Sequence, residues 1–161
     1  MNVIDDLGIL AISTRLQRLS EQFRKDGAAL YKAYNIDFEP KWFPVIYTLS
    51  QKKMLSIIEL ADEIGYTHPS TINLLKELEK QKLIRSTKDR NDERKRLVQL
   101  TSKGAELIVK MKPVWELMTS ALTEILETDH HLLKAITAVE ENLRQHTFLQ
   151  RSLKLANLNS K

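Results

Sequence analysis

The apolar residues between Ser56 and Thr101 change their spacing along the chain, and these changes define four predicted elements. The first element is a helix whose apolar residues recur at helical spacing: Ile57, Leu60, Ala61 and Ile64. Ser56 and Glu59 stand three positions apart at its start, as in a capping box, where each side chain satisfies a free backbone N–H. Gly65 is expected to end this helix, because the residue after a helix commonly needs a positive φ.

The second element is a helix predicted from Pro69 to about Lys82. One side of this helix is apolar and faces the core: Thr71, Ile72, Leu74, Leu75 and Leu78. The opposite side carries Pro69, Asn73, Lys76 and Lys80. Either Thr67 or His68 is expected to cap it, and proline suits the first turn. Two short helices joined by a tight glycine turn, the second with polar groups and lysine outside, predict a helix-turn-helix.

Two strands are predicted next, at 83–87 and 96–100, because short apolar and β-branched runs there are bounded by turn residues. The segment KDRNDERK joins them and contains no apolar residue. Helix, helix, strand, charged loop and strand together predict a winged helix-turn-helix.

Long amphipathic helices are predicted on both sides of this module. They span about 5–35, with Gly27 as the place for a bend, about 102–128, and from 128 or 129 to 158. A short aromatic-rich helix covers 41–50. The predicted fold is thus mainly α with a small β-hairpin wing, in a single domain over 1–161 with a winged core at about 38–101. Because the small core cannot cover all apolar residues of the terminal helices, 5–35 and 102–158 are expected to form a two-fold homodimer.

The charge of the chain is concentrated on the predicted wing and the helix before it. Nine Lys or Arg and five Asp or Glu lie between Lys76 and Arg96, and this surplus equals the net charge of +4 of the whole chain. A basic patch on one module indicates a polyanionic partner, although a charged run by itself more often marks a solvated loop.

Composition narrows the remaining classes. The chain has no cysteine, which excludes disulfides, thiolate metal sites and thiol-based sensing. No apolar run approaches the roughly 18–20 residues of a membrane span, and no secretory leader opens the chain, so we expect a cytoplasmic protein without membrane contact.

The run DRNDERKRLVQLTSKG resembles the wing of MarR-type transcriptional regulators, in which D-x-R-D-x-R is followed by L-T-x-x-G. The matching residues are Asp89, Asp92, Arg94, Leu100, Thr101 and Gly104. Asn91 stands where the family usually has an arginine. The resemblance extends over nearly the whole chain. It implies a homodimeric regulator, more often a repressor, that binds an imperfect palindrome in double-stranded DNA.

On this resemblance, the helix at 69–82 enters the major groove with its N-terminal end foremost. Ser70, Thr71 and Asn73 are expected to reach base edges there. Lys76 and the backbone amides at the helix start, next to Thr67, would hold phosphates. For His68, a contact with DNA and a purely capping role remain open.

On the wing, Arg94 is expected to enter the minor groove, oriented by a charge-assisted hydrogen bond that it donates to Asp92. Arg90, Asn91 and Lys95 would meet the DNA backbone. The simpler interpretation of Asp92 and Arg94 is a surface ion pair that contributes little.

A small organic effector is the further expected partner. The candidate residues for an aromatic pocket are Tyr31, Trp42, Tyr47 and Trp115. Core packing is the commoner reason for such an aromatic cluster, so both interpretations are carried forward.

No enzymatic activity, cofactor or metal site is predicted. His130 and His131 would diverge by about 100° on a helix, which makes them poor common ligands. Glycine-rich phosphate loops and the sequence signatures of hydrolases and metalloproteases are missing from the sequence. The alternative function is a winged helix used to bind another protein, and a steep salt dependence of DNA binding would distinguish the two.

Overall fold

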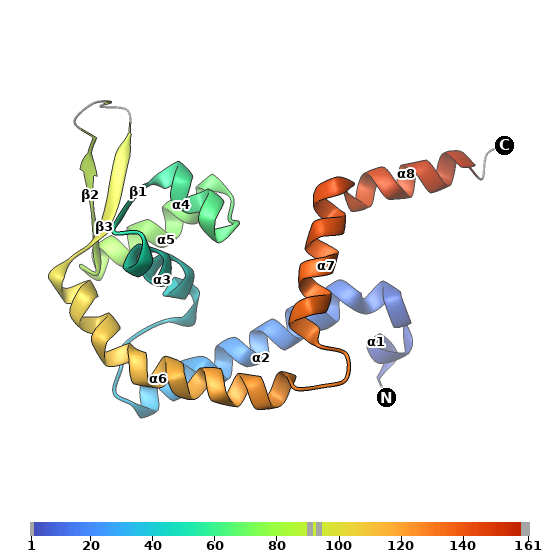
Figure 1. The fold of residues 1–161 in the computed structure, drawn as a ribbon, viewed down its shortest axis with the longest axis horizontal. Coiled ribbons are helices and arrows are strands. Elements are labelled where there is room, and N and C mark those ends of the chain that lie inside the picture. Colours follow the sequence, from blue (N-terminus) through green and yellow to red (C-terminus); the bar gives the residue numbers. More distant parts are fainter. Residues whose placement is uncertain (1, 90–91, 93–94, 159–161) are drawn as a thin grey trace. The chain divides into compact units, whose positions relative to one another are not determined.

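The computed structural model describes residues 2–89, 92 and 95–158, and the chain divides into two compact units, residues 1–116 and 117–161. Helices make up most of both units, and a three-stranded sheet lies in the first (Figure 1). This confirms the predicted fold class of a mainly α protein with a winged helix-turn-helix. The organisation as a single domain over 1–161 stays a prediction.

The first unit begins with α1 (Val3–Asp6), a short 3-10 helix η1 (Gly8–Ala11) and α2 (Ile12–Ala33). The prediction of one helix over 5–35 is therefore wrong at its start. Gly8 has a φ of +61°, and this left-handed conformation interrupts a right-handed helix. Gly27, the expected place for a bend, is an ordinary helical residue of α2.

The winged core follows the connector after α2. Its helices are η2 (Pro40–Trp42), α3 (Phe43–Gln51), α4 (Ile57–Ile64) and α5 (His68–Lys80), and its strands are β1 (Met54–Ser56), β2 (Ile84–Lys88) and β3 (Arg96–Leu100). Strand β3 lies in the middle and runs antiparallel to both neighbours, with Val98 opposite Leu55 of β1 and Ser86 of β2. The wing is thus the hairpin β2–β3, extended by one short strand.

Local sequence signals set the ends of α4 and α5. The capping box is confirmed: Ser56 N donates to Glu59 Oε2 at 2.8 Å and Glu59 N donates to Ser56 Oγ at 3.3 Å. Gly65 ends α4 with a φ of +67°. Thr67, not His68, caps α5, because its extended backbone leaves its Oγ1 to accept from Ser70 N at 3.4 Å.

The core of the first unit lies between these helices and the sheet. Its completely or almost completely buried side chains are Val45, Ile46, Leu49, Leu60, Leu78 and Val98, together with Met111 and Val114 of α6 (Ser102–Leu126). The apolar sides of α4 and α5 thus contribute to the core, as their helical spacing predicted.

The L-T-x-x-G segment joins the wing to α6. Thr101 Oγ1 donates to Lys82 O at 2.7 Å and accepts from Gly104 N at 3.1 Å. Gly104 is buried against the backbone carbonyl of Leu83, where a Cβ atom would collide with the carbonyl oxygen. These residues of the motif therefore stabilise the junction between the hairpin and the helix.

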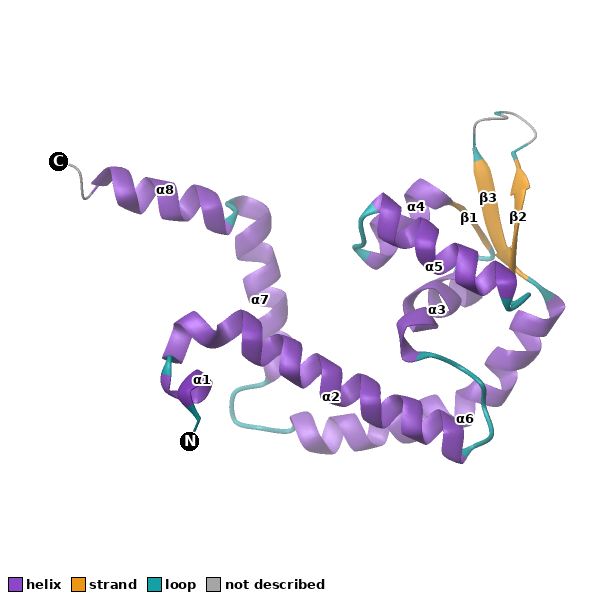
Figure 2. Ribbon diagram, turned by 180° about the vertical axis from the view of Figure 1, so that it is seen from behind, coloured by secondary structure: helices purple, strands orange, loops and turns teal. Residues whose placement is uncertain are grey.

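The second unit contains the end of α6, then α7 (Leu132–Gln145) and α8 (Phe148–Leu158), which Figure 2 shows as separate helices. The prediction of one last helix from 128 or 129 to 158 is wrong. His131 has a φ of +44° just before α7. A second capping box then starts α8, since Thr147 N donates to Gln150 Oε1 at 2.8 Å and Gln150 N donates to Thr147 Oγ1 at 3.2 Å.

Candidate nucleic-acid interface

Helix α5 has one face in the core and one in solvent. Thr71, Leu74, Leu75 and Leu78 are buried, whereas Pro69, Ser70, Asn73, Lys76 and Lys80 are exposed. An exposed stripe of hydroxyl, amide and ammonium groups on a rigidly packed helix suits contact with base edges and phosphates. The structure thus brings together four of the predicted α5 residues, His68, Ser70, Asn73 and Lys76, on the solvent side.

Thr71 requires a correction. Its side chain is completely buried, and its Oγ1 donates to Thr67 O at 3.1 Å, so it is not available to a DNA base. For Thr71 the sequence predicts both a place on the apolar side of the helix and a contact with a base edge. Its burial favours the place on the apolar side. Thr67 is likewise occupied at the helix start, where its Oγ1 donates to Ser70 Oγ at 2.9 Å.

Two backbone hydrogen bonds define the loop end of the wing. Asp89 N donates to Lys95 O and Lys95 N donates to Asp92 O, both at 2.9 Å, so backbone bonds close the hairpin below its tip. Lys95 and Asp92 are exposed. The predicted contacts Arg90, Asn91 and Arg94 lie outside the described residues. In the middle of the hairpin, Ser86 Oγ accepts from Arg96 at 3.0 Å and donates to Glu79 of α5, which links β2 to that helix.

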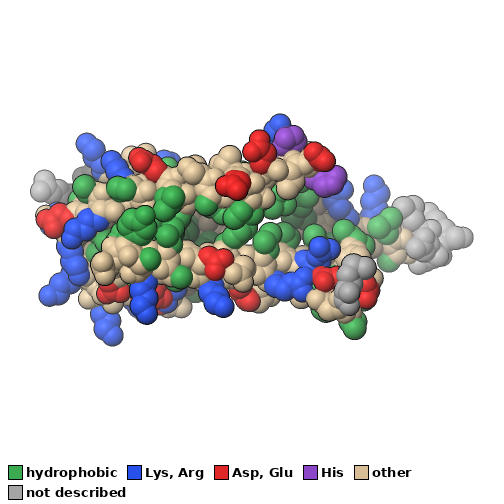
Figure 3. Space-filling model, turned by 90° about the horizontal axis from the view of Figure 1, so that it is seen from below, with side chains coloured by type: hydrophobic (Ala, Val, Ile, Leu, Met, Phe, Trp, Pro, Cys, Tyr) green, Lys and Arg blue, Asp and Glu red, His purple; other side chains and the backbone are tan. Residues whose placement is uncertain are grey.

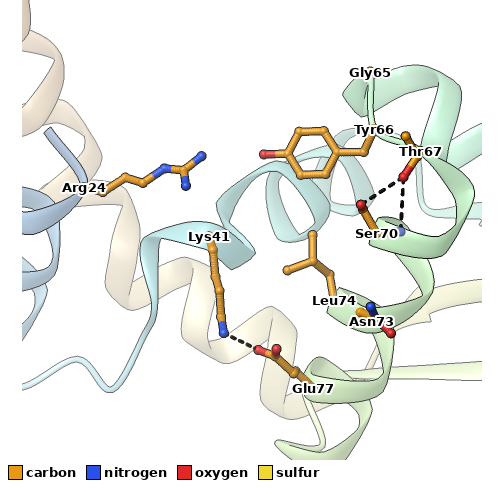
Figure 4. A pocket seen from close by; sticks show the side chains of 9 residues that line it. All are labelled: Arg24, Lys41, Gly65, Tyr66, Thr67, Ser70, Asn73, Leu74 and Glu77. Atoms are coloured by element: carbon orange, nitrogen blue, oxygen red, sulfur yellow. Dashed lines mark hydrogen bonds and ion pairs between the residues drawn. The ribbon is translucent and has the colours of Figure 1, made fainter. Parts of the chain in front are cut away.

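A notch of about 560 Å³ opens on the flank of α5 that faces α2 and η2. Figure 4 shows Arg24 of α2 and Lys41 of η2 on one side of it, and Tyr66, Asn73 and Glu77 on the other. The notch combines cationic, amide and aromatic groups directly beside the exposed stripe of α5. No local pattern in the sequence indicates this notch, because its residues come from three distant segments.

Glu77 links α5 to η2 inside this notch. Its Oε2 accepts from the Trp42 indole N–H at 2.9 Å and pairs with the Lys41 ammonium at 2.7 Å (Figure 4 draws the ion pair). The hydrogen bond from Lys41, followed by that from Trp42, lowers the pKa of Glu77 below its ordinary value. The same contact raises the pKa of Lys41. Both groups are therefore charged throughout the neutral range.

The four candidate effector residues belong to one aromatic cluster of the first unit. Trp115 Nε1 donates to Tyr31 Oη at 2.9 Å, and Trp115 packs edge-on against Tyr47 at a ring separation of 5.7 Å. Trp42 reaches Tyr31 through Phe38, with ring separations of 5.7 and 5.1 Å. The cluster thus connects α2, η2, α3 and α6.

Burial corrects part of the effector prediction. Tyr31 and Trp42 have exposed fractions of 2% and 4%, so both are core residues in this structure and neither lines an open pocket. Burial also raises the pKa of Tyr31 above its ordinary value. Tyr47 keeps an exposed edge, stacked on Phe43 at a ring separation of 5.3 Å. Packing had been the commoner interpretation of this cluster, and it holds for two of the four residues.

Among the described residues, no group of three or more His, Cys, Asp or Glu is placed to hold a metal ion. Every described helix is too short or too polar to cross a membrane.

Comparisons with known proteins agree with this geometry. Residues 36–95 match the family model described as the MarR family. Solved structures with the same fold include the Mycobacterium tuberculosis regulator MOSR in complex with DNA, with a TM-score of 0.71, 17% identity, and coverage of 83% of this chain and 96% of that chain. A comparison with curated protein sequences found no match.

Two other solved structures match this chain at 25% sequence identity. The transcriptional repressor CouR, bound to a 23-mer DNA duplex, has a TM-score of 0.67 and covers 83% of this chain and 96% of its own. NadR in complex with 4-hydroxyphenylacetate has a TM-score of 0.58 and covers 80% of this chain and 90% of its own.

Proposed function

We propose that this chain, which belongs to the MarR family, binds double-stranded DNA and regulates transcription. The exposed face of α5 is the observation that carries the proposal. Ser70, Asn73 and Lys76 project from a helix whose other face is packed in the core. Such a helix can enter the major groove as a rigid body, with the amide of Asn73 suited to adenine. The similarity to a repressor bound to a duplex supports this interpretation.

The wing is the second part of the proposed interface. We propose that exposed Lys95, at the loop end of the hairpin, and exposed His68, at the start of α5, each meet a phosphate. Arg90, Asn91, Asp92 and Arg94 keep the roles that the family resemblance implies, with Arg94 in the minor groove. Because several phosphates are contacted, affinity should fall steeply as salt is raised.

We further propose that the protein acts as a homodimer on an imperfect palindrome, as a repressor. Large apolar side chains remain exposed on both terminal segments, among them Leu10 at 81%, Leu149 at 65% and Phe148 at 79%. Figure 3 shows hydrophobic side chains among the charged and polar ones on the side that it draws. Exposed large apolar side chains of this kind mark association sites, and a second copy supplies matching side chains by symmetry.

We propose that a small organic effector binds at the exposed edge of the aromatic cluster. Tyr47 and Phe43 have exposed fractions of 44% and 37%, and Trp115 lies against both rings. A small aromatic molecule could stack there, and the similarity to a protein crystallised with 4-hydroxyphenylacetate supports this ligand class. Titration of 4-hydroxyphenylacetate into the wild type and the Tyr47→Ala variant tests the site. Equal affinities for both would remove it.

Selection of bound duplexes from a random pool tests DNA binding and yields the operator in one experiment. We expect an enriched sequence with two inverted half-sites about one helical turn apart. Binding to the selected duplex is then measured between low and moderate salt, with Asn73→Ala and Lys76→Ala as variants. Asn73→Ala should relax the base preference at one position, and Lys76→Ala should reduce the salt slope by about one.

A winged helix that binds another protein gives the opposite result. In that case no sequence is enriched from the pool, and the binding of DNA at low salt is weak and equal for all duplexes. Either outcome would refute the proposed function.

A further inference from the structure

We infer that Glu77 is a positioning residue for α5, which it fastens to a relay of aromatic side chains that reaches α6. The inference rests on the proposed function, since α5 must be the helix that reads DNA. It adds a residue that does not touch DNA itself but fixes where the reading helix sits.

The α5 end of the relay is the pair of contacts made by the Glu77 carboxylate. One oxygen receives both the Trp42 indole N–H at 2.9 Å and the Lys41 ammonium at 2.7 Å. Lys41 also pairs with Glu39 at 3.1 Å, so the cation is held from two sides. Charge-assisted hydrogen bonds with fixed partners constrain a helix more than apolar contacts do, because they specify both direction and distance.

The relay continues from Trp42 through rings in edge-to-face contact. Trp42 meets Phe38 at a ring separation of 5.7 Å and Phe38 meets Tyr31 at 5.1 Å, with interplanar angles of 84° and 72°. The Tyr31 hydroxyl then accepts from Trp115 Nε1 of α6 at 2.9 Å. Tyr31, Phe38 and Trp42 are all buried, and close packing restricts the movement of these side chains.

The charge of Glu77 makes the inference testable. A carboxylate on a helix that approaches phosphates is unfavourable for DNA binding by simple electrostatics. If Glu77 had no positioning role, its removal would leave the affinity unchanged or raise it. A positioning role predicts the opposite sign, because α5 loses its tether to η2 and samples orientations that do not fit the groove.

The experiment compares binding of the selected duplex by the wild type, Glu77→Ala and Glu77→Gln. We expect about tenfold weaker binding for Glu77→Ala, since a charge-assisted contact is lost. Glu77→Gln should lie between the two, because its amide oxygen still accepts from Trp42 Nε1. The salt slope should stay that of the wild type in both variants, because no phosphate contact is removed.

Asp62→Asn is the matched control. Asp62 is an exposed carboxylate on α4. Removing this charge should leave the affinity for DNA equal or slightly higher. Thermal unfolding of each variant, followed by circular dichroism, shows whether the winged core is still folded under the binding conditions.

Two further measurements separate positioning from general destabilisation. In a double-mutant cycle of Glu77→Ala and Trp42→Phe, the loss of affinity should be less than the sum of the single losses, because both remove the same contact. The two tryptophans of the chain give two indole N–H signals in a nitrogen-correlated NMR spectrum. Glu77→Gln should shift the Trp42 signal. Tyr31→Phe should shift the Trp115 signal and also weaken DNA binding severalfold with an unchanged salt slope.

The inference is overturned if Glu77→Ala binds the duplex as tightly as the wild type, or more tightly, while the wild type itself binds. It is also overturned if the Glu77 and Trp42 losses are additive. A wild type that binds no duplex refutes the proposed function first, which is a different result.

Discussion

Apolar side chains of the winged core are buried within one chain, whereas many of those in the terminal helices are exposed. In the core, Leu60, Leu78 and Val98 are completely or almost completely buried within one chain. In α7 no residue is buried, and Ile9 and Leu10 of η1 have exposed fractions of 80% and 81%. The apolar residues of the core are therefore covered within one chain, whereas these terminal segments carry apolar side chains that one chain leaves exposed.

The largest expected effect is on the core. Leu78→Ala removes a completely buried side chain from α5, and we expect it to lower the free energy of unfolding by about 2–5 kcal/mol. Chemical denaturation measures this loss. In contrast, Leu10→Ala should change the stability of the isolated chain very little at protein concentrations below the dimer dissociation constant. An equal loss in both variants would contradict the distinction between the two regions.

The next effect concerns association. Leu149→Asp places a charge on an exposed apolar face of α8, and both copies of a two-fold dimer carry it. We expect the dimer dissociation constant to rise by on the order of a hundredfold, because an interface residue is replaced by a charge that would be buried. Analytical ultracentrifugation over a dilution series measures it. Lys154→Asp, also on α8, is a control for added negative charge, and a similar weakening there would refute the apolar explanation.

Gly104→Ala probes the junction between the two regions. The added methyl group would collide with the Leu83 carbonyl oxygen, a backbone atom that cannot rotate away. We expect a loss of about 1–3 kcal/mol in the free energy of unfolding, because α6 must move away from the hairpin. Gly27→Ala, inside α2, should be neutral or stabilising, since alanine is the better helix former. Denaturation curves of the two variants give this comparison directly.

The two capping boxes offer the same local motif in both regions. Ser56→Ala should lower the free energy of unfolding by about 1 kcal/mol, because Ser56 is buried and its cap belongs to the cooperative core. Thr147→Ala should instead increase amide exchange in α8 alone, with little change in global unfolding. Hydrogen exchange followed by mass spectrometry distinguishes these outcomes, and a global effect of Thr147→Ala would contradict the comparison.

The smallest effect is the pH dependence of the first capping box. The hydrogen bonds with Ser56 lower the pKa of Glu59 below its ordinary value, which the unfolded chain regains. Its contribution to stability is therefore complete above the unfolded pKa and is lost as pH falls through the folded pKa. We expect the stability difference between the wild type and Glu59→Gln to shrink on acidification. Denaturant midpoints across the acidic range measure it.

Local rules explain how much of the winged core could be predicted. The helix ends and the core face of α5 depend on neighbours within one or two helical turns. Their effect can therefore be predicted from the sequence, as for Ser56, Gly65 and the periodic leucines of α5. The break at Thr147 was equally legible, because Thr147 and Gln150 have capping-box spacing, but the apolar pattern that runs across it suggested one helix. The break at Gly8 carried only the weak signal of a lone glycine.

The sequence by itself determined the order of elements, the solvent and core faces of α5, and the concentration of charge on the wing. Only the tertiary structure decided that Thr71 is buried, that Tyr31 and Trp42 belong to the core, and that Glu77 meets Lys41 and Trp42. The physical reason is distance along the chain. Periodicity specifies the direction of a side chain from its own helix, whereas its partner comes from a segment tens of residues away, whose position depends on the packing of the whole unit.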